Sequence, residues 1–378
     1  MLLALAVTTG SAPLAWTYRT GNYSWAVAVS SDGRYVIAGS DDMHTYFFDT
    51  SSLGGKPSWI HDASGYVRHV VVSSNASYAA AGDTAGEIFL FRSPVLGESA
   101  SVFLADSAIE ALAMSDGGAY LAGGDRQGIV YVFRTSQIYF PLWRYAVPGG
   151  VFSLSLSQSG ALAAASTHGG LYFLGDMSSS SGWIWSFKNE TSFPYVAISR
   201  DASYVVAGGS DGYVYLLNSL GELIGRQKLG GAVSALKLST TADTIVAGST
   251  NGRVSLCLVQ GGLAETNSIT IQRPVTSVAI SENGKRVGVA DLDGTISMFD
   301  ESLGTPLWTF DSEAIVHSLS ISDNGLVTAA SDDTGSIYLF NEEVPERTNQ
   351  TTLGIAFVST ICVILLVIYL ARGKKRLR

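Results

Sequence analysis

A repeat of 40–43 residues restricts the folds open to this chain more than any other feature. One serine ends an apolar run in each of eight units: Ser30, Ser73, Ser115, Ser157, Ser199, Ser239, Ser281 and Ser322. Nine residues after it comes a small residue, which indicates that two packed strands approach closely there. Thirteen residues after it comes a glycine, with Met43 as the exception. Three positions that recur at the same spacing over eight units predict a repeat architecture.

Each unit has the pattern of four short strands. In the first unit, residues 26–30, 35–39 and 46–49 are apolar runs separated by turn-forming Ser, Asp and Gly. A fourth strand is often opened by a tryptophan, namely Trp16, Trp59, Trp143, Trp183 or Trp308. Four short strands per unit at this period are typical of a propeller blade. The low charged fraction of 15 % and the 41 glycines also favour strands and turns.

The order of these strands predicts how the ring closes. The chain opens with a tryptophan strand at residues 14–18, and the last unit ends at Phe340 after three strands. We expect the N-terminal strand to complete the last unit, which removes an exposed sheet edge. The predicted fold class is therefore all-β, an eight-bladed β-propeller of four-stranded blades over residues 14–340, closed by the N-terminal strand and followed by one C-terminal transmembrane helix.

The repeats resemble those of known propeller families. Residues 300–308 (Asp-Glu-Ser-Leu-Gly-Thr-Pro-Leu-Trp) are similar to the tryptophan-docking motif of quinoprotein-like (PQQ-like) propellers. Residues 14–340 as a whole resemble WD-repeat and quinoprotein-like propellers of the prokaryotic, membrane-anchored type. The chain lacks the Gly-His and Trp-Asp pairs of WD repeats and the adjacent cysteine pair of quinone dehydrogenases. The resemblance thus implies the fold and no quinone chemistry, and we predict no cofactor.

Residues 353–371 form an uncharged apolar run, long enough to cross a bilayer core as a helix. Acidic residues dominate the preceding linker, residues 341–352, and five basic residues lie in the tail, residues 372–378. The positive-inside rule then places the C-terminus in the cytoplasm and the propeller outside. The predicted location is the cell membrane, single-pass, with the lipid bilayer as a partner through residues 353–371.

Two further features agree with export. Residues 1–13 resemble the end of a signal peptide, or form an N-terminal tail. Four asparagines in Asn-X-Ser/Thr sequons are candidate glycosylation sites: Asn22, Asn75, Asn189 and Asn349.

The charge of the chain argues against nucleic acid as a partner. The formal net charge is −9, and without the basic tail it is −14. Such a surface repels phosphate backbones. The two cysteines, Cys257 and Cys362, do not form a metal-ligand spacing, and no metal site is predicted.

The residues just before the inner strands are predicted to surround one end of a central channel. They are Trp25, Arg68, Glu110, Phe152, Pro194, Ser234, Thr276 and His317. They differ from unit to unit, as a binding surface would, although ordinary rim residues remain the alternative. The candidate partner-binding residues are Trp25, Arg68, Glu110, Phe152 and His317. His69, beside Arg68, is expected to face the channel.

Turns on the same face are rich in aspartate: Asp41, Asp42, Asp83, Asp125, Asp211, Asp291, Asp293, Asp332 and Asp333. Aspartate favours turns because its carboxylate caps backbone N–H groups. Cation binding is the alternative, but no turn has the ligand spacing of a calcium loop.

No catalytic motif appears: the chain has no Gly-X-Ser-X-Gly elbow, no phosphate-binding glycine loop and no HEXXH helix. The predicted function is that of a non-catalytic, membrane-anchored surface propeller that binds a protein or glycan partner or acts as a scaffold outside the cell. Two alternatives stay open. One is an enzyme, a hydrolase or lyase using Arg68, Glu110 and His317, and the other is a subunit of a membrane assembly complex.

Overall fold

The computed structural model describes residues 10–52, 54–92, 100–158, 160, 162–166, 170–174, 184–239, 244–259 and 261–343. Every regular element in these residues is a β-strand. The chain divides into two units, Met1–Asn341 and Glu342–Arg378.

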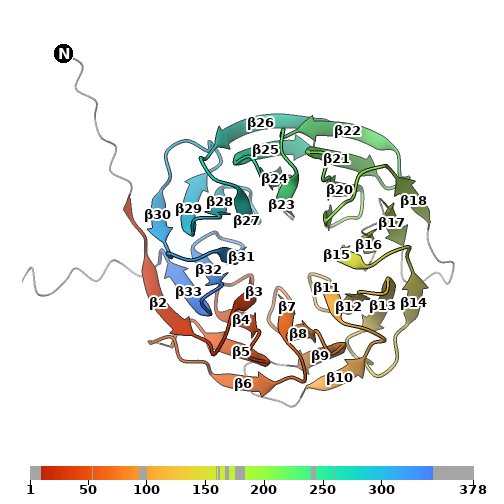
Figure 1. The fold of residues 1–378 in the computed structure, drawn as a ribbon, viewed down its shortest axis with the longest axis horizontal. Helices are drawn as coiled ribbons and strands as arrows, with labels where there is room; N and C mark the ends of the chain where they lie inside the picture. Colours follow the sequence, from red (N-terminus) through yellow and green to blue (C-terminus); the bar gives the residue numbers. More distant parts are fainter. Residues whose placement is uncertain are drawn as a thin grey trace, which may run out of the picture. The chain divides into compact units, whose positions relative to one another are not determined.

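The strands form eight sheets arranged in a ring around a central channel (Figure 1). Six sheets contain four consecutive antiparallel strands: β3 (Ser24–Val29), β4 (Tyr35–Ser40), β5 (His44–Asp49) and β6 (Trp59–Asp62); β7 (Val67–Val72), β8 (Tyr78–Asp83), β9 (Glu87–Arg92) and β10 (Ser101–Leu104); β11 (Ile109–Met114), β12 (Tyr120–Asp125), β13 (Ile129–Arg134) and β14 (Trp143–Ala146); β15 (Val151–Leu156), β16 (Leu162–Ser166), β17 (Gly170–Leu174) and β18 (Trp185–Lys188); β19 (Tyr195–Ile198), β20 (Tyr204–Gly208), β21 (Tyr213–Asn218) and β22 (Leu223–Lys228); β23 (Val233–Leu238), β24 (Thr244–Ser249), β25 (Arg253–Val259) and β26 (Leu263–Thr270).

The remaining two sheets combine strands from both ends of the chain. One contains β27 (Val275–Ile280), β28 (Arg286–Asp291), β29 (Thr295–Asp300), β30 (Trp308–Asp311) and β1 (Gly10–Ser11). The other contains β31 (Val316–Ile321), β32 (Val327–Asp332), β33 (Ser336–Asn341) and β2 (Leu14–Arg19). In this second sheet β2 pairs antiparallel with β33, with Trp16 opposite Leu339. The N-terminal tryptophan strand thus occupies the closing position expected from the sequence.

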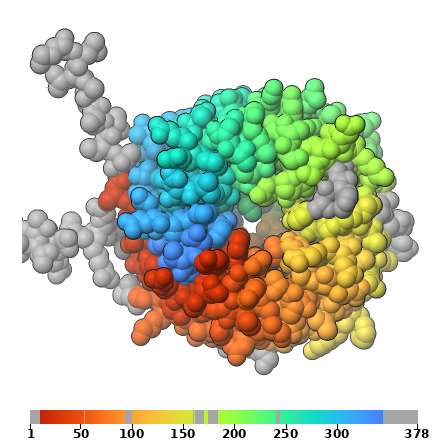
Figure 2. Space-filling view, in the orientation of Figure 1, coloured from red at the N-terminus to blue at the C-terminus, as the bar shows by residue number. Residues whose placement is uncertain are grey.

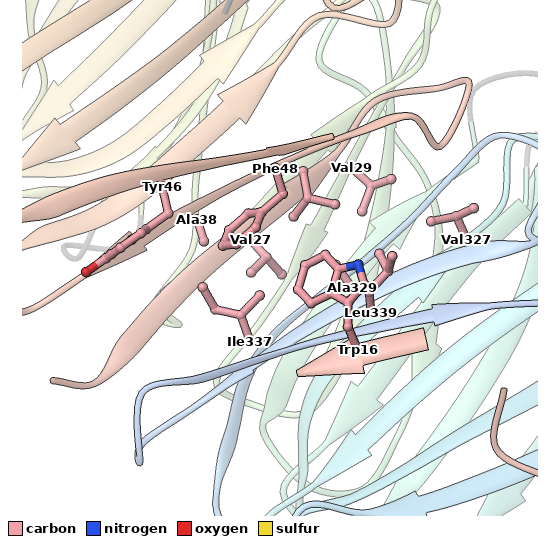
Figure 3. Close-up of a cluster of buried hydrophobic side chains, with 11 residues drawn as sticks. Trp16, Val27, Val29, Ala38, Tyr46, Phe48, Val327, Ala329, Ile337 and Leu339 are labelled. Carbon is pink, nitrogen blue, oxygen red and sulfur yellow. The ribbon is translucent and has the colours of Figure 1, made fainter. Parts of the chain in front are cut away.

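A buried apolar cluster packs the closing sheet against the sheet of β3–β6 (Figure 3). Trp16 lies against Phe48, with ring centroids 5.0 Å apart. Val27 and Val29 from β3 meet Ile337 and the neighbouring apolar residues of β32 and β33. Burial of large apolar side chains on both sides joins the first and last parts of the ring.

The predicted fold class was wrong in two respects. The sheet of β27–β30 has a fifth strand, because β1 pairs with β30 in parallel, so the blades are not all four-stranded. In addition, none of the described elements is a helix of the length and apolar character needed to cross a membrane. The predicted transmembrane helix at 353–371 lies outside the described residues. An uncharged run meets a length requirement for a span, but length alone does not establish a helix.

The predicted location is corrected together with the helix on which it rested. A single-pass cell-membrane protein with the propeller outside and the C-terminus in the cytoplasm requires a membrane-crossing element. The described residues contain no helix of that kind. The predicted location was therefore wrong. It was also the basis for the bilayer contact through residues 353–371 and for the outward orientation of the propeller.

The repeated serine is explained by the turn that it begins. Its hydroxyl oxygen accepts a hydrogen bond from the backbone N–H five residues later, at 2.9–3.0 Å. This bond is made by Ser30, Ser73, Ser115, Ser199, Ser239, Ser281 and Ser322. These serines are buried. One buried hydroxyl thereby satisfies a backbone donor that the inner hairpin would otherwise leave without a partner.

The small residues nine positions after the serine lie where neighbouring sheets touch. A Cβ atom at Gly208 would lie 2.5 Å from Val233 of the next sheet, and one at Gly248 would lie 2.4 Å from Val275. Gly39, Gly82 and Gly124 stand in the same relation to their next sheets. The predicted close approach is confirmed at these five positions.

The turn glycines have left-handed backbone conformations. Their φ values lie between 81° and 95° at Gly86, Gly128, Gly212, Gly252, Gly294 and Gly335. Met43, the exception in the sequence, adopts the same region with φ 67°. Glycine enters this region without steric cost, whereas methionine does not.

Candidate functional site

The inner strands surround a cavity of about 670 Å³ at the centre of the ring. Figure 2 shows that the molecule is hollowed at this point. Seven of the eight positions predicted to surround the channel line this cavity: Trp25, Arg68, Glu110, Phe152, Pro194, Thr276 and His317. We call these seven residues the mouth ring. They converge because each lies at or just before the first residues of an inner strand, and all inner strands start on the same face.

The eighth position does not join them. Ser234 is not part of the cavity wall, and its hydroxyl donates a hydrogen bond to the Val275 carbonyl at 2.6 Å.

Three mouth-ring side chains from three different sheets form one stack. The rings of Trp25 and His317 lie face to face, with centroids 4.1 Å apart and planes inclined by 24°. The Arg68 guanidinium lies 4.9 Å from the centroid of the Trp25 ring. Such cation–π contacts hold a guanidinium against an indole face. The stack spans the seam between the first and last sheets of the ring.

Arg68 is also bound to a carboxylate from the neighbouring sheet. Its Nε and Nη2 donate to the two oxygens of Asp41 at 3.1 and 3.0 Å. Asp41 is only 8 % exposed. The hydrogen bonds to Asp41 raise the pKa of Arg68. The bidentate pair therefore fixes the orientation of the guanidinium and balances its charge.

The rest of the mouth contains a second ion pair and two exposed aromatic rings. The Glu110 carboxylate accepts a hydrogen bond from Arg126 Nε at 2.7 Å. Phe152, on β15, is 47 % exposed, and Tyr66, whose ring lies 5.6 Å from the Arg68 guanidinium carbon, is 41 % exposed. The mouth thus presents apolar rings among charges that are already paired.

Burial lowers the pKa of both His69 and His317, which line the cavity. Burial lowers the pKa of His69 to about 4, and the positive charge of Arg68 acts in the same direction. Burial also lowers the pKa of His317, against the opposing effect of Asp333 and other carboxylates. His69 lines the channel, as the sequence predicted.

The residues proposed for the enzyme alternative are engaged with different partners. Arg68 binds Asp41, Glu110 binds Arg126, and His317 stacks on Trp25. The Nε2 atom of His317 is enclosed and has no hydrogen-bond partner among the described residues. The observed contacts join none of these three residues to another.

The aspartates of the turns act as caps. Asp83, Asp125, Asp291 and Asp332 each accept a hydrogen bond from the backbone N–H four residues later, at 2.7–3.0 Å. Asp332 also accepts one from the Tyr338 hydroxyl at 2.8 Å. Within the described part of the chain, no group of His, Cys, Asp and Glu side chains could hold a metal ion. These contacts agree with the capping interpretation.

The candidate sequon asparagines lie apart from the cavity. Asn22, Asn75 and Asn189 are exposed residues outside the strands. Asn349 lies outside the described residues. Glycosylation at these positions was predicted for a chain outside the cell, and it remains without a structural observation.

The sequence interpretation missed Lys237 and Tyr66. Lys237 lies on β23 and lines the central cavity. In the other repeats its position holds Ala, Ser or Val, so one lysine among them was the signal. Tyr66 lies in the loop directly before β7. It was missed because it is not one of the positions that recur in every unit.

Two segments of the chain match a known repeat family. The match is to the WD domain, G-beta repeat, over residues 17–49 and 267–300. Both segments end on Phe-Asp, at Phe48-Asp49 and Phe299-Asp300, where the repeat signature has Trp-Asp. The WD-repeat part of the predicted resemblance is thus confirmed for these segments. Its quinoprotein-like and membrane-anchored parts are not shown.

The chain is similar in fold to several solved structures. The computationally designed protein Ika8 is 20 % identical, with a TM-score of 0.75, and covers 88 % of this chain and 100 % of its own. Sqt1 from Chaetomium thermophilum, bound to the N-terminus of the ribosomal protein L10, is 17 % identical, with the same TM-score and coverage. Sqt1 from Saccharomyces cerevisiae is 12 % identical, with a TM-score of 0.74, and covers 89 % of this chain and 100 % of its own. No curated protein sequence matches the chain.

Proposed function

We propose that this chain is a propeller scaffold that binds a protein partner at the mouth of its central channel. The observation that carries the proposal is the stack of Arg68, Trp25 and His317, which lines the same cavity as the exposed Phe152. Tryptophan, tyrosine and arginine in rigid, partly enclosed settings provide most of the binding energy at protein interfaces. The mouth collects side chains of this kind.

The paired charges of the mouth support the same function. Arg68 and Glu110 are each neutralised by a neighbour, so a partner that covers them does not have to compensate an isolated charge. The aromatic rings of Phe152 and Tyr66 are exposed, although burial of apolar surface is what stabilises the rest of the fold. A partner that covers both rings would bury apolar area and leave the ion pairs intact.

The structural relatives agree with a role in protein binding. One Sqt1 structure contains the N-terminus of a ribosomal protein. The identity of 17 % makes this a likeness of fold, and the partner of Sqt1 is not transferred. No observation favours a glycan, an enzymatic reaction or a membrane complex over a protein partner.

The test is partner capture with matched variants. Purified full-length protein is immobilised and exposed to an extract of its source cells, and recovered proteins are quantified. We expect one or more partners whose recovery falls at least about tenfold with Phe152→Ala/Tyr66→Ala, since losing two aromatic anchors costs more than the roughly 1.4 kcal/mol that corresponds to tenfold.

The control is Phe140→Ala, which removes an exposed ring from the loop between β13 and β14. Its recovery should equal that of the wild type. Recovery that is the same for the wild type and the mouth variant would exclude the mouth as the binding surface.

A further inference from the structure

We propose a second site, inside the channel, where Lys237 binds a small oxyanion of the carboxylate or phosphate type. Lys237 lies on the inner strand β23, and its side chain lines the 670 Å³ cavity below the mouth. It also lines a second cavity, of about 410 Å³, that shares His69 and Ser318 with the first. Lys237 therefore lies where the two parts of the channel meet.

Lys237 has no counter-charge. Among the described residues it makes no hydrogen bond or ion pair, whereas Arg68 and Glu110 in the same cavity are both paired. The Lys237 side chain is exposed to the channel, yet partial desolvation lowers its pKa, with no contribution from a carboxylate. The walls of the channel also include Leu238, Ile280 and Leu319. The ammonium group is left without an anion that would pair its charge.

The fold does not require a lysine at this position. The equivalent residues in the other units are Ala28, Val71, Ala113, Ser155, Ala197, Ala279 and Ser320. The serines among them join neighbouring sheets, since Ser155 accepts a hydrogen bond from the Ile198 N–H at 3.1 Å and Ser320 accepts one from the Val29 N–H at 3.0 Å. A lysine cannot accept such a bond. Lys237 therefore cannot form the hydrogen bond that these serines accept from the neighbouring sheet, and it places a cation in the channel.

The chemistry of the channel selects the ligand. A lysine ammonium is a compact charge with three donors, which suits the oxygens of a carboxylate or phosphate. Ser277 lines the same cavity, and its hydroxyl accepts a hydrogen bond from the Leu319 N–H while keeping a hydrogen that can be donated. Electrostatic attraction is stronger within a channel of the protein than on its open surface. The net charge of −9 makes this unpaired cation more distinctive still.

The experiment is calorimetric titration of the full-length protein at constant ionic strength. Sodium acetate and sodium phosphate are titrated separately, with sodium chloride as the reference, so the two arms distinguish a carboxylate site from a phosphate site. We expect binding at one site for at least one oxyanion. Lys237→Met should weaken it at least tenfold, and Lys285→Met, which removes an exposed lysine, should leave it unchanged.

A second measurement keeps the test independent of the folding of the variant. The lysines of the wild type are labelled by reductive ¹³C-methylation, and phosphate or acetate is added while their NMR signals are followed. The signal of Lys237, assigned by its absence in Lys237→Arg, should shift at low millimolar oxyanion, while those of exposed lysines should not.

The proposal would be overturned if neither oxyanion bound the wild type, or if Lys237→Met bound as tightly. It does not rest on the protein-binding function, because Phe152→Ala/Tyr66→Ala should retain oxyanion binding.

Discussion

At the scale of single residues, the Ser322 hydroxyl shows why the repeat retains a serine. It accepts a hydrogen bond from the Val327 N–H at 3.0 Å and donates one to Asn324 at 2.7 Å. Ser322→Ala leaves the buried Val327 donor without its partner. We expect a loss of about 1–2 kcal/mol in the free energy of unfolding, measured by urea denaturation. The exposed Ser302→Ala should change it by less than about 0.5 kcal/mol, and equal losses for both would contradict this account of the turn.

His69 makes stability depend on pH. Its pKa is about 4 in the folded protein and near its usual value of 6.5 in the unfolded chain. Between these values the unfolded chain binds a proton that the folded protein does not, so stability is lost as pH falls from 6.5 to 4. We expect His69→Gln to reduce that loss by about 1–2 kcal/mol. Denaturation curves across this pH range would test this, and parallel pH profiles would show that His69 is not responsible.

At the scale of strands and sheets, glycine sets the distance between neighbours. An added Cβ at Gly208 would meet Val233 at 2.5 Å, so Gly208→Ala must displace the next sheet. Overpacking of this kind costs about 1–3 kcal/mol. Gly117 has no atom within 4 Å of an added Cβ, and Gly117→Ala is the matched control. Thermal unfolding should show a lower midpoint for the first variant only; a lower midpoint for both would point to backbone effects instead.

Most of the strands could be predicted from the sequence because the repeat fixes several registers together. The serine, the small residue and the turn glycine each have a local cause, and together they place the inner hairpins. The outer strands were less well defined. Trp183 was expected to open the fourth strand of its unit, but it lies outside the described residues, and β18 begins at Trp185, which stacks on Phe173. The parallel pairing of β1 with β30 could not be predicted, because β1 consists of only two residues, Gly10 and Ser11.

The site was predictable in part for the same reason. Positions defined by the repeat, such as Trp25 and His317, could be aligned and therefore placed around one cavity. Pairings across sheets could not: Asp41 and Arg68 are 27 residues apart, and nothing in either segment indicates that they bind each other. Lys237 was overlooked because nothing in the sequence distinguishes a lysine exposed to the channel from one exposed on the outer surface.

At the scale of the whole molecule, closure of the ring depends on β2. Trp16 is 8 % exposed and packs between the closing sheet and the sheet of β3–β6. Trp16→Ala should cost about 3–5 kcal/mol, observed as a lower urea midpoint. Leu14→Ala, at an exposed position of the same strand, should have little effect. If both variants were as stable as the wild type, β2 would not be the element that holds the ring closed.

The central claim is that a protein partner contacts the mouth of the channel, and site-specific photo-crosslinking tests it most directly. A photoreactive phenylalanine analogue is placed at Phe152 in one sample and at Phe140 in another, since both side chains are exposed. After irradiation in an extract of the source cells, position 152 should yield a discrete crosslinked partner, and position 140 should not. Crosslinks to the same partner from position 140, with none from position 152, would contradict the claim.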